Sequence, residues 1–243
     1  MKDFLQDLVS HVHSLGFLPT IRVTASATQT DIESMSEDHS VVLNAKTTNP
    51  VAGLDGVFGM PNLNKLDLHL KCPEYKDGAQ ISVVTQNRNG VDELAGLHFQ
   101  NSTGDFKNDY RFMSTNVINE KLKSVKFKGA KWDIEFEPSM ASIQRLKFQA
   151  AAHTEEPTFY VTTEDGNLVF NFGDSNTHSG SFIFQTGITG KLKQIWAWPV
   201  AHVLSILSLP GDISIKIADA GLMQITVNSG VAEYNYILPS QSK

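Results

Sequence analysis

The sequence contains a repeat with an offset of 138 residues, and this repeat limits the possible folds more than any other feature. PTIRVT begins at Pro19 and PTFYVT at Pro157, so the offset is 157 − 19 = 138. Pro61 and Pro199 are separated by the same number of residues. Because matches along several successive segments share one offset, we infer two copies of one structural unit. The same offset relates three apolar pairs: Leu5 with Ile143, Leu8 with Leu146, and Leu66 with Leu204.

Each copy is predicted to combine helices with short strands, which is the α+β fold class. In residues 3–15, Leu5, Leu8, Val12 and Leu15 form one apolar stripe at helical spacing. Further helices are predicted at 60–70, 138–153 and 198–209; the third begins with a Pro-Ser start signal. Segments rich in β-branched and aromatic residues, bounded by Gly, Asn and Asp, predict strands at 20–27, 40–47, 79–86, 94–100, 159–163, 167–172, 181–187, 213–219, 222–227 and 232–238.

The repeat predicts two domains, at residues 1–115 and 131–243, joined by a connector at 116–130. The connector is polar and rich in lysine. KLKSVKFKGAK holds five of the 20 basic residues between Lys121 and Lys131. Such a run is either a solvated surface or a patch that attracts acidic surfaces of partner proteins.

Composition excludes several classes of protein. A net charge of −6 and a pI near 5.7 argue against a generally basic nucleic-acid binder. The single cysteine, Cys72, excludes an internal disulfide and fits a reducing compartment. The N-terminal segment lacks the apolar core of a signal peptide, and no apolar run approaches the roughly 18 residues of a membrane span. We therefore expect a cytoplasmic protein with no membrane partner.

The sequence offers little that could carry catalysis. G-x-S-x-G, P-loop and Cys-x-x-Cys motifs are absent, and the glycine-rich stretch at 53–59 lacks a following Lys-Ser/Thr, so it is interpreted as a turn. His69 and Cys72 are interpreted as ordinary residues of a short helix rather than a catalytic dyad. His11 and His13 would face different ways on a helix. We expect no enzyme activity, no metal and no cofactor.

Three passages carry a resemblance to a known family. They are GDISIKIADAGLMQITVNSGVAEYNYILPS at 211–240, EPSMASIQRL at 137–146 and ESMSEDHSVVL at 33–43. The first two resemble the final hairpin and the long second-domain helix of DNA sliding clamps, most closely those of T-even-like bacteriophages. The third is similar to the part of the eukaryotic clamp, the proliferating cell nuclear antigen, where a Met and a His border the partner-docking pocket.

The resemblance implies a processivity factor in viral DNA replication. Such a protein is a ring around duplex DNA, with helices lining the hole and antiparallel sheets outside. Because the ring has six similar units, two units per chain imply a homotrimer. The implied partners are double-stranded DNA without sequence preference, a DNA polymerase, an ATP-dependent clamp loader and other copies of this chain, in the cytoplasm of the host cell.

Basic residues on the predicted helices are candidates for DNA contact. A trimer would carry 3 × −6 = −18 charges, so contact with phosphates has to be local. The resemblance places Lys71 and Lys147 where the eukaryotic clamp has basic residues facing its hole. The alternative is that these side chains are ordinary solvated surface. The candidates are Lys65, Lys71, Arg145 and Lys147.

The resemblance also implies a pocket for a short apolar-aromatic peptide of the polymerase or the loader. Its predicted walls come from the chain's last strand, from the connector and from the segment after residue 33. Pro239 lacks an amide donor and would end the last strand. The alternative is that the last strand is a buried sheet edge. The candidate residues are Met35, His39, Val117, Ile118, Leu122, Tyr236, Leu238 and Pro239.

A second function fits the same features. Two β-rich domains with an acidic surface also describe phage structural or adaptor proteins without enzyme activity. The sequence leaves this alternative open.

Overall fold

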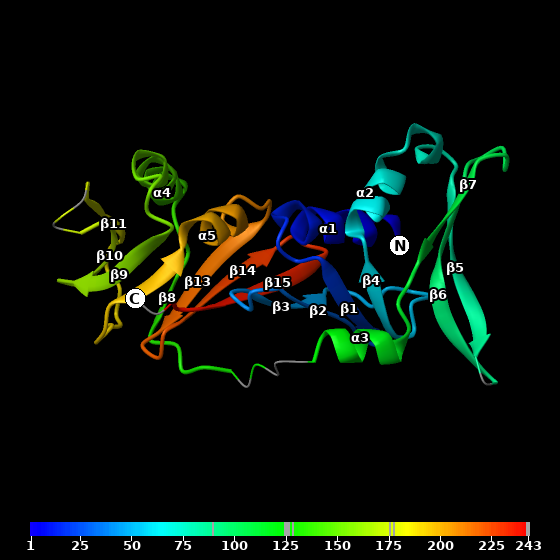
Figure 1. Cartoon of the computed structure of the whole chain (residues 1–243), viewed down its shortest axis with the longest axis horizontal. Helices are drawn as coiled ribbons and strands as arrows, with labels where there is room; N and C mark the ends of the chain where they lie inside the picture. Colours follow the sequence, from blue (N-terminus) through cyan, green and yellow to red (C-terminus); the bar gives the residue numbers. More distant parts are fainter. Residues whose placement is uncertain (89, 124–126, 128, 175, 177, 242–243) are drawn as a thin grey trace. The chain divides into compact units, whose positions relative to one another are not determined.

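The computed structural model describes residues 1–241 except 89, 124–126, 128, 175 and 177 (Figure 1). Its contacts divide the chain into two compact units. The first consists of Met1–Lys126 with Ser229–Tyr234, and the second of Phe127–Asn228 with Asn235–Lys243. The domain boundaries drawn from the sequence stay a prediction.

The first unit contains two antiparallel sheets, with strand orders β4-β1-β2-β3 and β5-β6-β7. Figure 1 shows α1 on one side of the strands β1 to β4 and α3 on the other. The elements are α1 (Lys2–His11), the 3-10 helix η1 (His13–Leu15), β1 (Thr20–Ala25), β2 (Thr30–Met35), β3 (Val42–Thr47), β4 (Gly56–Pro61), α2 (Leu63–Lys71), the 3-10 helix η2 (Pro73–Tyr75), β5 (Gln80–Arg88), β6 (Val91–Gln100), β7 (Lys107–Arg111) and α3 (Thr115–Lys121).

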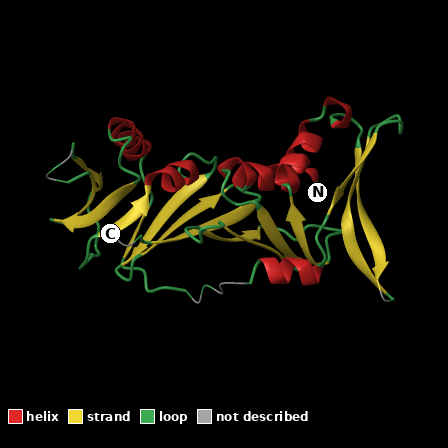
Figure 2. Ribbon diagram, viewed as in Figure 1, coloured by secondary structure: helices red, strands yellow, loops and turns green. Residues whose placement is uncertain are grey.

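The second unit has the strand orders β11-β10-β9-β12 and β15-β14-β13-β8. Both of its helices lie on the same side of the strands β9, β10 and β12 (Figure 2). The elements are β8 (Ile134–Phe136), α4 (Met140–Ala152), β9 (Thr158–Glu164), β10 (Asn167–Phe172), β11 (Gly180–Gln185), β12 (Trp196–Pro199), α5 (Val200–Ile206), β13 (Asp212–Ala218), β14 (Leu222–Asn228) and β15 (Ala232–Pro239), of which residues 232–234 belong to the first unit.

The repeat predicted from the sequence is present in the strand pairing. Thr20 pairs with Pro61 between β1 and β4, and Thr158 pairs with Pro199 between β9 and β12. Both residues of the second pair lie 138 positions after those of the first. The helices also correspond, because α1 begins at Lys2 and α4 at Met140. Each copy therefore runs helix, four strands, helix, three strands, and the predicted α+β class is confirmed.

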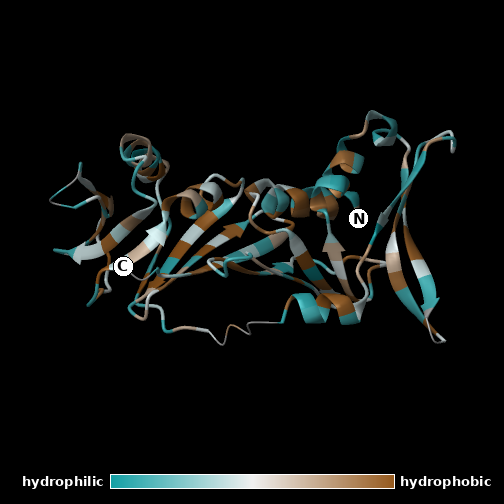
Figure 3. Ribbon diagram, in the orientation of Figure 1, coloured by the Kyte–Doolittle hydropathy of each residue, from teal (hydrophilic) through white to brown (hydrophobic). Residues whose placement is uncertain are grey.

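The apolar stripes of the helices form the cores, as predicted. Leu5, Leu8 and Val12 are fully buried in the first unit. The alternation of apolar and polar residues along β13 and β14 is visible in Figure 3. In the second unit a phenylalanine cluster fills the core, with Phe170 stacked on Phe184 at 4.2 Å between ring centroids. Ser139 caps the first turn of α4, where its hydroxyl accepts the amide N–H of Ser142 at 3.0 Å.

Several elements differ from the sequence interpretation. The stretch at 53–59 was predicted as a turn, yet strand β4 occupies Gly56–Pro61 and buries Phe58 and Met60. Its glycines obscured the strand pattern. The helices predicted at 60–70 and 198–209 begin later, at Leu63 and Val200, because a strand precedes each of them. Helix α3, at Thr115–Lys121, occupies the first part of the segment predicted as a connector.

Candidate functional site

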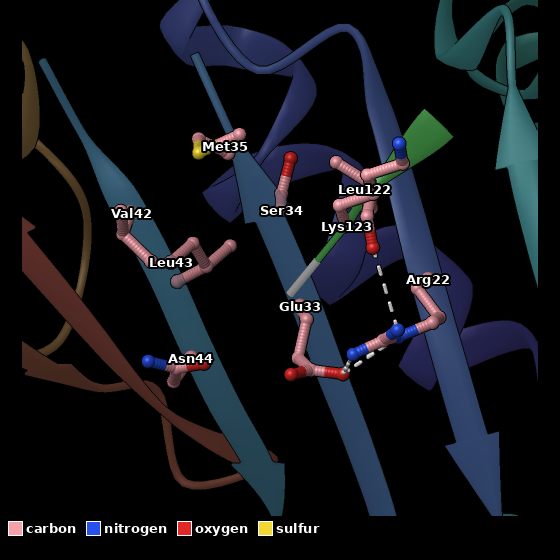
Figure 4. Close-up of a pocket in the computed structure, with 9 residues that line it drawn as sticks. All are labelled: Arg22, Glu33, Ser34, Met35, Val42, Leu43, Asn44, Leu122 and Lys123. Atoms are coloured by element: carbon pink, nitrogen blue, oxygen red, sulfur yellow. Dashed lines mark hydrogen bonds and ion pairs between the residues drawn. The ribbon is translucent and has the colours of Figure 1, made fainter. Parts of the chain in front are cut away.

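A pocket lies over the strands β1, β2 and β3 in the first unit (Figure 4). It holds about 290 Å³ of space open to solvent. Its floor is set by the antiparallel register, which aligns Arg22 with Glu33 and Glu33 with Asn44 in one row across the sheet. The lining residues are Arg22, Glu33, Ser34, Met35, Val42, Leu43, Asn44, Leu122 and Lys123.

Arg22 ties the floor of this pocket to the last turn of α3 and to Leu122, the residue that follows the helix. Its Nε donates to the carboxylate of Glu33 at 2.7 Å, and its Nη2 donates to the same oxygen. Its Nη1 donates to Asn119 Oδ1 at 3.3 Å and to the carbonyl oxygen of Leu122 at 3.5 Å. Figure 4 shows the guanidinium between the carboxylate and this carbonyl. The ion pair neutralises the charges of Arg22 and Glu33 at the floor of the pocket. The bonds to Asn119 and Leu122 hold Leu122 in place as a wall of the pocket.

Helix α3 is fixed on β4 by close packing. Ile118 is fully buried, and a Cβ on Gly59 would lie only 2.8 Å from its Cδ1 atom. The amides and carbonyls of Gly59 and Met113 exchange two hydrogen bonds, of 3.0 and 2.8 Å. Thr115 Oγ1 donates to the carbonyl oxygen of Val57 at 2.6 Å. These contacts position Leu122 over the sheet.

The pocket brings together two of the residues predicted to form a docking site, Met35 and Leu122. Ile118 does not line this pocket and lies in the contact between α3 and β4. Val117 is 49% exposed on α3, and His39 is exposed in the turn between β2 and β3 with a φ of 60°. The docking role of these residues stays a prediction.

The predicted docking residues of the last strand lie in the second unit. Tyr236 and Leu238 are fully buried, and Trp198 Nε1 donates to the carbonyl oxygen of Leu238 at 3.0 Å. Ile237, between them in the strand, is also buried. Pro239 is exposed. Within this unit Tyr236 and Leu238 are core residues, so Pro239 is the member of the set that a partner could reach directly.

The predicted DNA-contacting residues lie on two helices. Lys65 and Lys71 are exposed on α2, where Lys71 Nζ lies 2.6 Å from a carboxylate oxygen of Asp67. Arg145 is exposed on α4, and Lys147 is half-buried there. Their role stays a prediction. Of the lysine-rich connector segment, Lys126 and Lys128 lie outside the described residues.

His69 adds no positive charge to α2 near neutral pH. Burial, together with the nearby charge of Lys65, lowers the pKa of the imidazole below its ordinary value of 6.5. The ring lies 5.1 Å from that of Phe99, between centroids. His69 therefore acts as a packing residue.

Sequence reasoning missed Arg22, Glu33, Val42 and Asn44 as pocket residues. The alternation of side chains along β2 and β3 could have identified those on these two strands, because every second side chain of a strand points to the same face of the sheet. Strand β2 was not predicted, so the row could not be assembled from the sequence.

Among the residues that the structure describes, no group of three or more His, Cys, Asp or Glu could hold a metal ion. The helices in the described part of the chain are all too short or too polar to cross a membrane.

Comparison with proteins of known structure identifies the fold of this chain. No protein-family model and no curated protein sequence matches the chain. A chain in the structure described as the C-terminal region of FEN-1 bound to A. fulgidus PCNA is 10% identical, with a TM-score of 0.71, and the match covers 100% of this chain and 97% of that one. PCNA from Thermococcus kodakaraensis is 12% identical with a TM-score of 0.65, over 99% and 97% of the two chains. The chain therefore has the PCNA-type sliding-clamp fold, with two similar domains as predicted.

Proposed function

We propose that the protein is a DNA sliding clamp, a non-enzymatic ring that encircles duplex DNA and tethers a DNA polymerase. The observation that carries this proposal is the likeness to PCNA over the whole length of both chains, at a TM-score of 0.71. A match of this extent includes both copies of the repeat. The sequence resemblance to the clamps of T-even-like phages supports a role in viral DNA replication in the cytoplasm of the host.

The ring is a homotrimer. Two copies of the repeat per chain give six units in three chains. Each unit supplies a sheet edge that another chain can extend, because β11 ends one sheet of the second unit and β5 and β7 end a sheet of the first. Edge strands pair readily with strands of other chains. Ile183 on β11 is 42% exposed and would be covered by such a contact.

The basic residues of α2 and α4 contact the phosphates of DNA. Arg145, Lys147 and Lys71, with Lys65 as a further member, supply local positive charge on a chain whose net charge is −6. Few phosphate contacts and no base contacts suit a protein that moves along the duplex.

The pocket lined by Arg22, Met35 and Leu122 takes a short apolar-aromatic segment of the polymerase or of the ATP-dependent loader. The A. fulgidus structure supports this proposal, because it contains the C-terminal region of FEN-1 bound to PCNA. Met35, Val42 and Leu122 supply the apolar walls of this pocket.

Oligomeric state and polymerase stimulation together test the proposal. Light scattering at micromolar concentration should give three times 26.8 kDa. Ile183→Asp should shift this mass toward the monomer, because it would bury a charge in the edge contact. Val91→Asp is the control, since Val91 is also β-branched and apolar and is 61% exposed at the start of β6. The trimer should lengthen the products of its polymerase on a long template when the loader and ATP are present. A monomer that has no effect on product length would refute the proposal.

A further inference from the structure

The charges that line the pocket of the first unit do not cancel. Arg22 is paired with Glu33, because its Nε and its Nη2 both donate to one carboxylate oxygen. Asn44, the next residue of the same row, is neutral. Lys123 is the remaining charged residue among the described residues of the lining. The lining therefore has a net positive charge near neutral pH, although the net charge of the chain is −6.

The ammonium group of Lys123 is available to a ligand. Within the described part of the chain it makes no hydrogen bond and no ion pair. Its side chain is exposed, so that water hydrates the charge while the pocket is empty. The carboxylate of Glu33 is turned toward Arg22 (Figure 4). The N–H donors of Lys123 can therefore bind an acceptor that a ligand supplies.

Lys123 directly follows an apolar wall of the pocket. Leu122 is 9% exposed, its amide donates to the carbonyl oxygen of Ile118 at 2.8 Å, and its own carbonyl oxygen accepts from Arg22 at 3.5 Å. These two bonds fix the backbone of Leu122 and thereby place Lys123 at the rim of the pocket. Successive Cα atoms of a chain are about 3.8 Å apart. A segment whose apolar side chain lies against Leu122 therefore brings its neighbouring residue close to Lys123.

We propose that this pocket selects a segment of the partner protein in which an aspartate or glutamate lies next to the apolar or aromatic residue. The carboxylate pairs with Lys123, while Met35, Val42 and Leu122 cover the apolar side chain. A basic residue at the same position of the segment is disfavoured, because it would lie beside a like charge. The proposal rests on the docking role proposed above for this pocket and adds the charge of the segment that it selects.

The exposure of Lys123 sets the size of the expected effect. Ion pairs between exposed side chains change an equilibrium constant by up to about fivefold, and salt weakens them. The acidic residue therefore adds selectivity to a contact whose main attraction is apolar.

Calorimetric titration of the full-length protein with two peptides tests the proposal. The probes are acetyl-Gly-Ser-Leu-Asp-Phe-Gly-amide and the same peptide with asparagine in place of aspartate, which keeps the shape and removes the charge. The aspartate peptide should bind roughly two- to fivefold more tightly at about 50 mM salt. The two affinities should converge at about 1 M salt, where the charges are screened.

Variants of the protein locate the charge. Lys123→Gln should abolish the preference for the aspartate peptide and leave the affinity for the asparagine peptide unchanged. Lys121→Gln is the matched control, because it removes the same charge from an exposed residue two positions away that does not line the pocket. The preference should persist in this control. A preference that survives in Lys123→Gln, or that is lost equally in both variants, would overturn the proposal.

Met35→Ala separates this proposal from the docking role on which it rests. It should weaken both peptides by a similar factor, because it removes part of an apolar wall. Equal binding of the two peptides, with both weakened by Met35→Ala, would overturn the charge selection alone. Binding of neither peptide, or binding that Met35→Ala leaves unchanged, would overturn the docking role and the charge selection together.

Discussion

The hydroxyl of Tyr234 donates a hydrogen bond of 2.7 Å to the carboxylate of Asp7, although the two residues lie 227 positions apart. Ser229 Oγ donates to the same carboxylate oxygen at 2.9 Å. The ring of Tyr234 stacks on His11 at 4.6 Å between centroids, and His11 Nδ1 lies 3.2 Å from the other oxygen of Asp7. Residues from the end of the chain therefore complete the first unit around its first helix.

This arrangement predicts that Asp7 stabilises the protein in a pH-dependent way. Burial raises the pKa of Asp7, but the hydrogen bonds from His11 and Tyr234 outweigh it and hold the pKa below its ordinary value of 3.8. The unfolded chain therefore binds this proton more readily than the folded one. The stabilisation is fully present above about pH 4 and is lost as the pH falls through the lower pKa of the folded state.

Asp7→Asn should lower the free energy of unfolding by about 1–3 kcal/mol near neutral pH, because hydrogen bonds to a charged group are lost. Urea unfolding at fixed protein concentration, between about pH 6 and pH 3, measures the effect. The difference from the wild type should shrink toward the acidic end. Asp3→Asn, at an exposed position on the same helix, should change stability little. A constant difference at every pH would contradict this role of Asp7.

Arg22 is predicted to hold the end of α3 and the residue after it against the sheet. Arg22→Met removes its bonds to Asn119 and Leu122 and should free this segment. Limited trypsin digestion should then cut after Lys121 and Lys123 several times faster than in the wild type, because cleavage follows the population of the open form. Arg111→Met removes an arginine that is 65% exposed on β7 and serves as the control. Identical cleavage rates in the two variants would show that Arg22 does not hold the segment.

The basic residues on α4 are predicted to contact DNA. Arg145→Gln with Lys147→Gln should reduce the slope of log affinity against log salt by roughly two units, one for each phosphate contact. Asp67→Asn should tighten binding, because it removes the carboxylate that pairs with Lys71. Fluorescence anisotropy with a labelled duplex at several salt concentrations measures both effects. Lys46→Gln, at an exposed position on β3, is the control, and an equal loss of slope there would indicate a diffuse charge effect.

Truncation to alanine is predicted to lower the stability of the protein strongly at Leu238 and little at Pro239. Leu238→Ala should cost about 2–5 kcal/mol of stability, since the side chain is fully buried in the second unit. Pro239→Ala should leave stability within about 1 kcal/mol, because the residue is exposed. Thermal unfolding of both variants measures the difference. If the Leu238 variant were as stable as the wild type, its side chain could not be a core residue.

The fold was largely predictable because apolar residues occupy equivalent positions in the two copies of the repeat. Leu5, Leu8 and Leu66 have equivalents in the second copy, and residues that pack the same core are restricted to the same types. Strands β4 and β12 escaped prediction because glycines interrupt the first and a proline followed by a helix pattern ends the second. Helix α3 escaped because one buried side chain, Ile118, fixes it, and a single apolar residue gives no periodic pattern.

The candidate site was less predictable than the fold. Met35 and Leu122 were identified through a family resemblance, and both line the pocket. Arg22 and Glu33 could not be found in this way, because their pairing depends on the register between β1 and β2. Tyr236 and Leu238 were predicted as pocket walls, but a sequence alone does not tell which side of a terminal strand its own unit covers. The structure buries both.

The central claim is that three chains close around duplex DNA, and the topology of the complex tests it most directly. The protein is mixed at high concentration with a linear duplex whose ends are then ligated, and the circle is isolated by gel filtration in high salt. A closed ring should stay on the circle, and each bound ring should have the mass of one trimer, three times 26.8 kDa. The ring should leave when a restriction enzyme cuts the circle. Blocking both new ends should prevent this release. Protein that leaves the intact circle in high salt, or that stays on cut DNA with free ends, would contradict the claim.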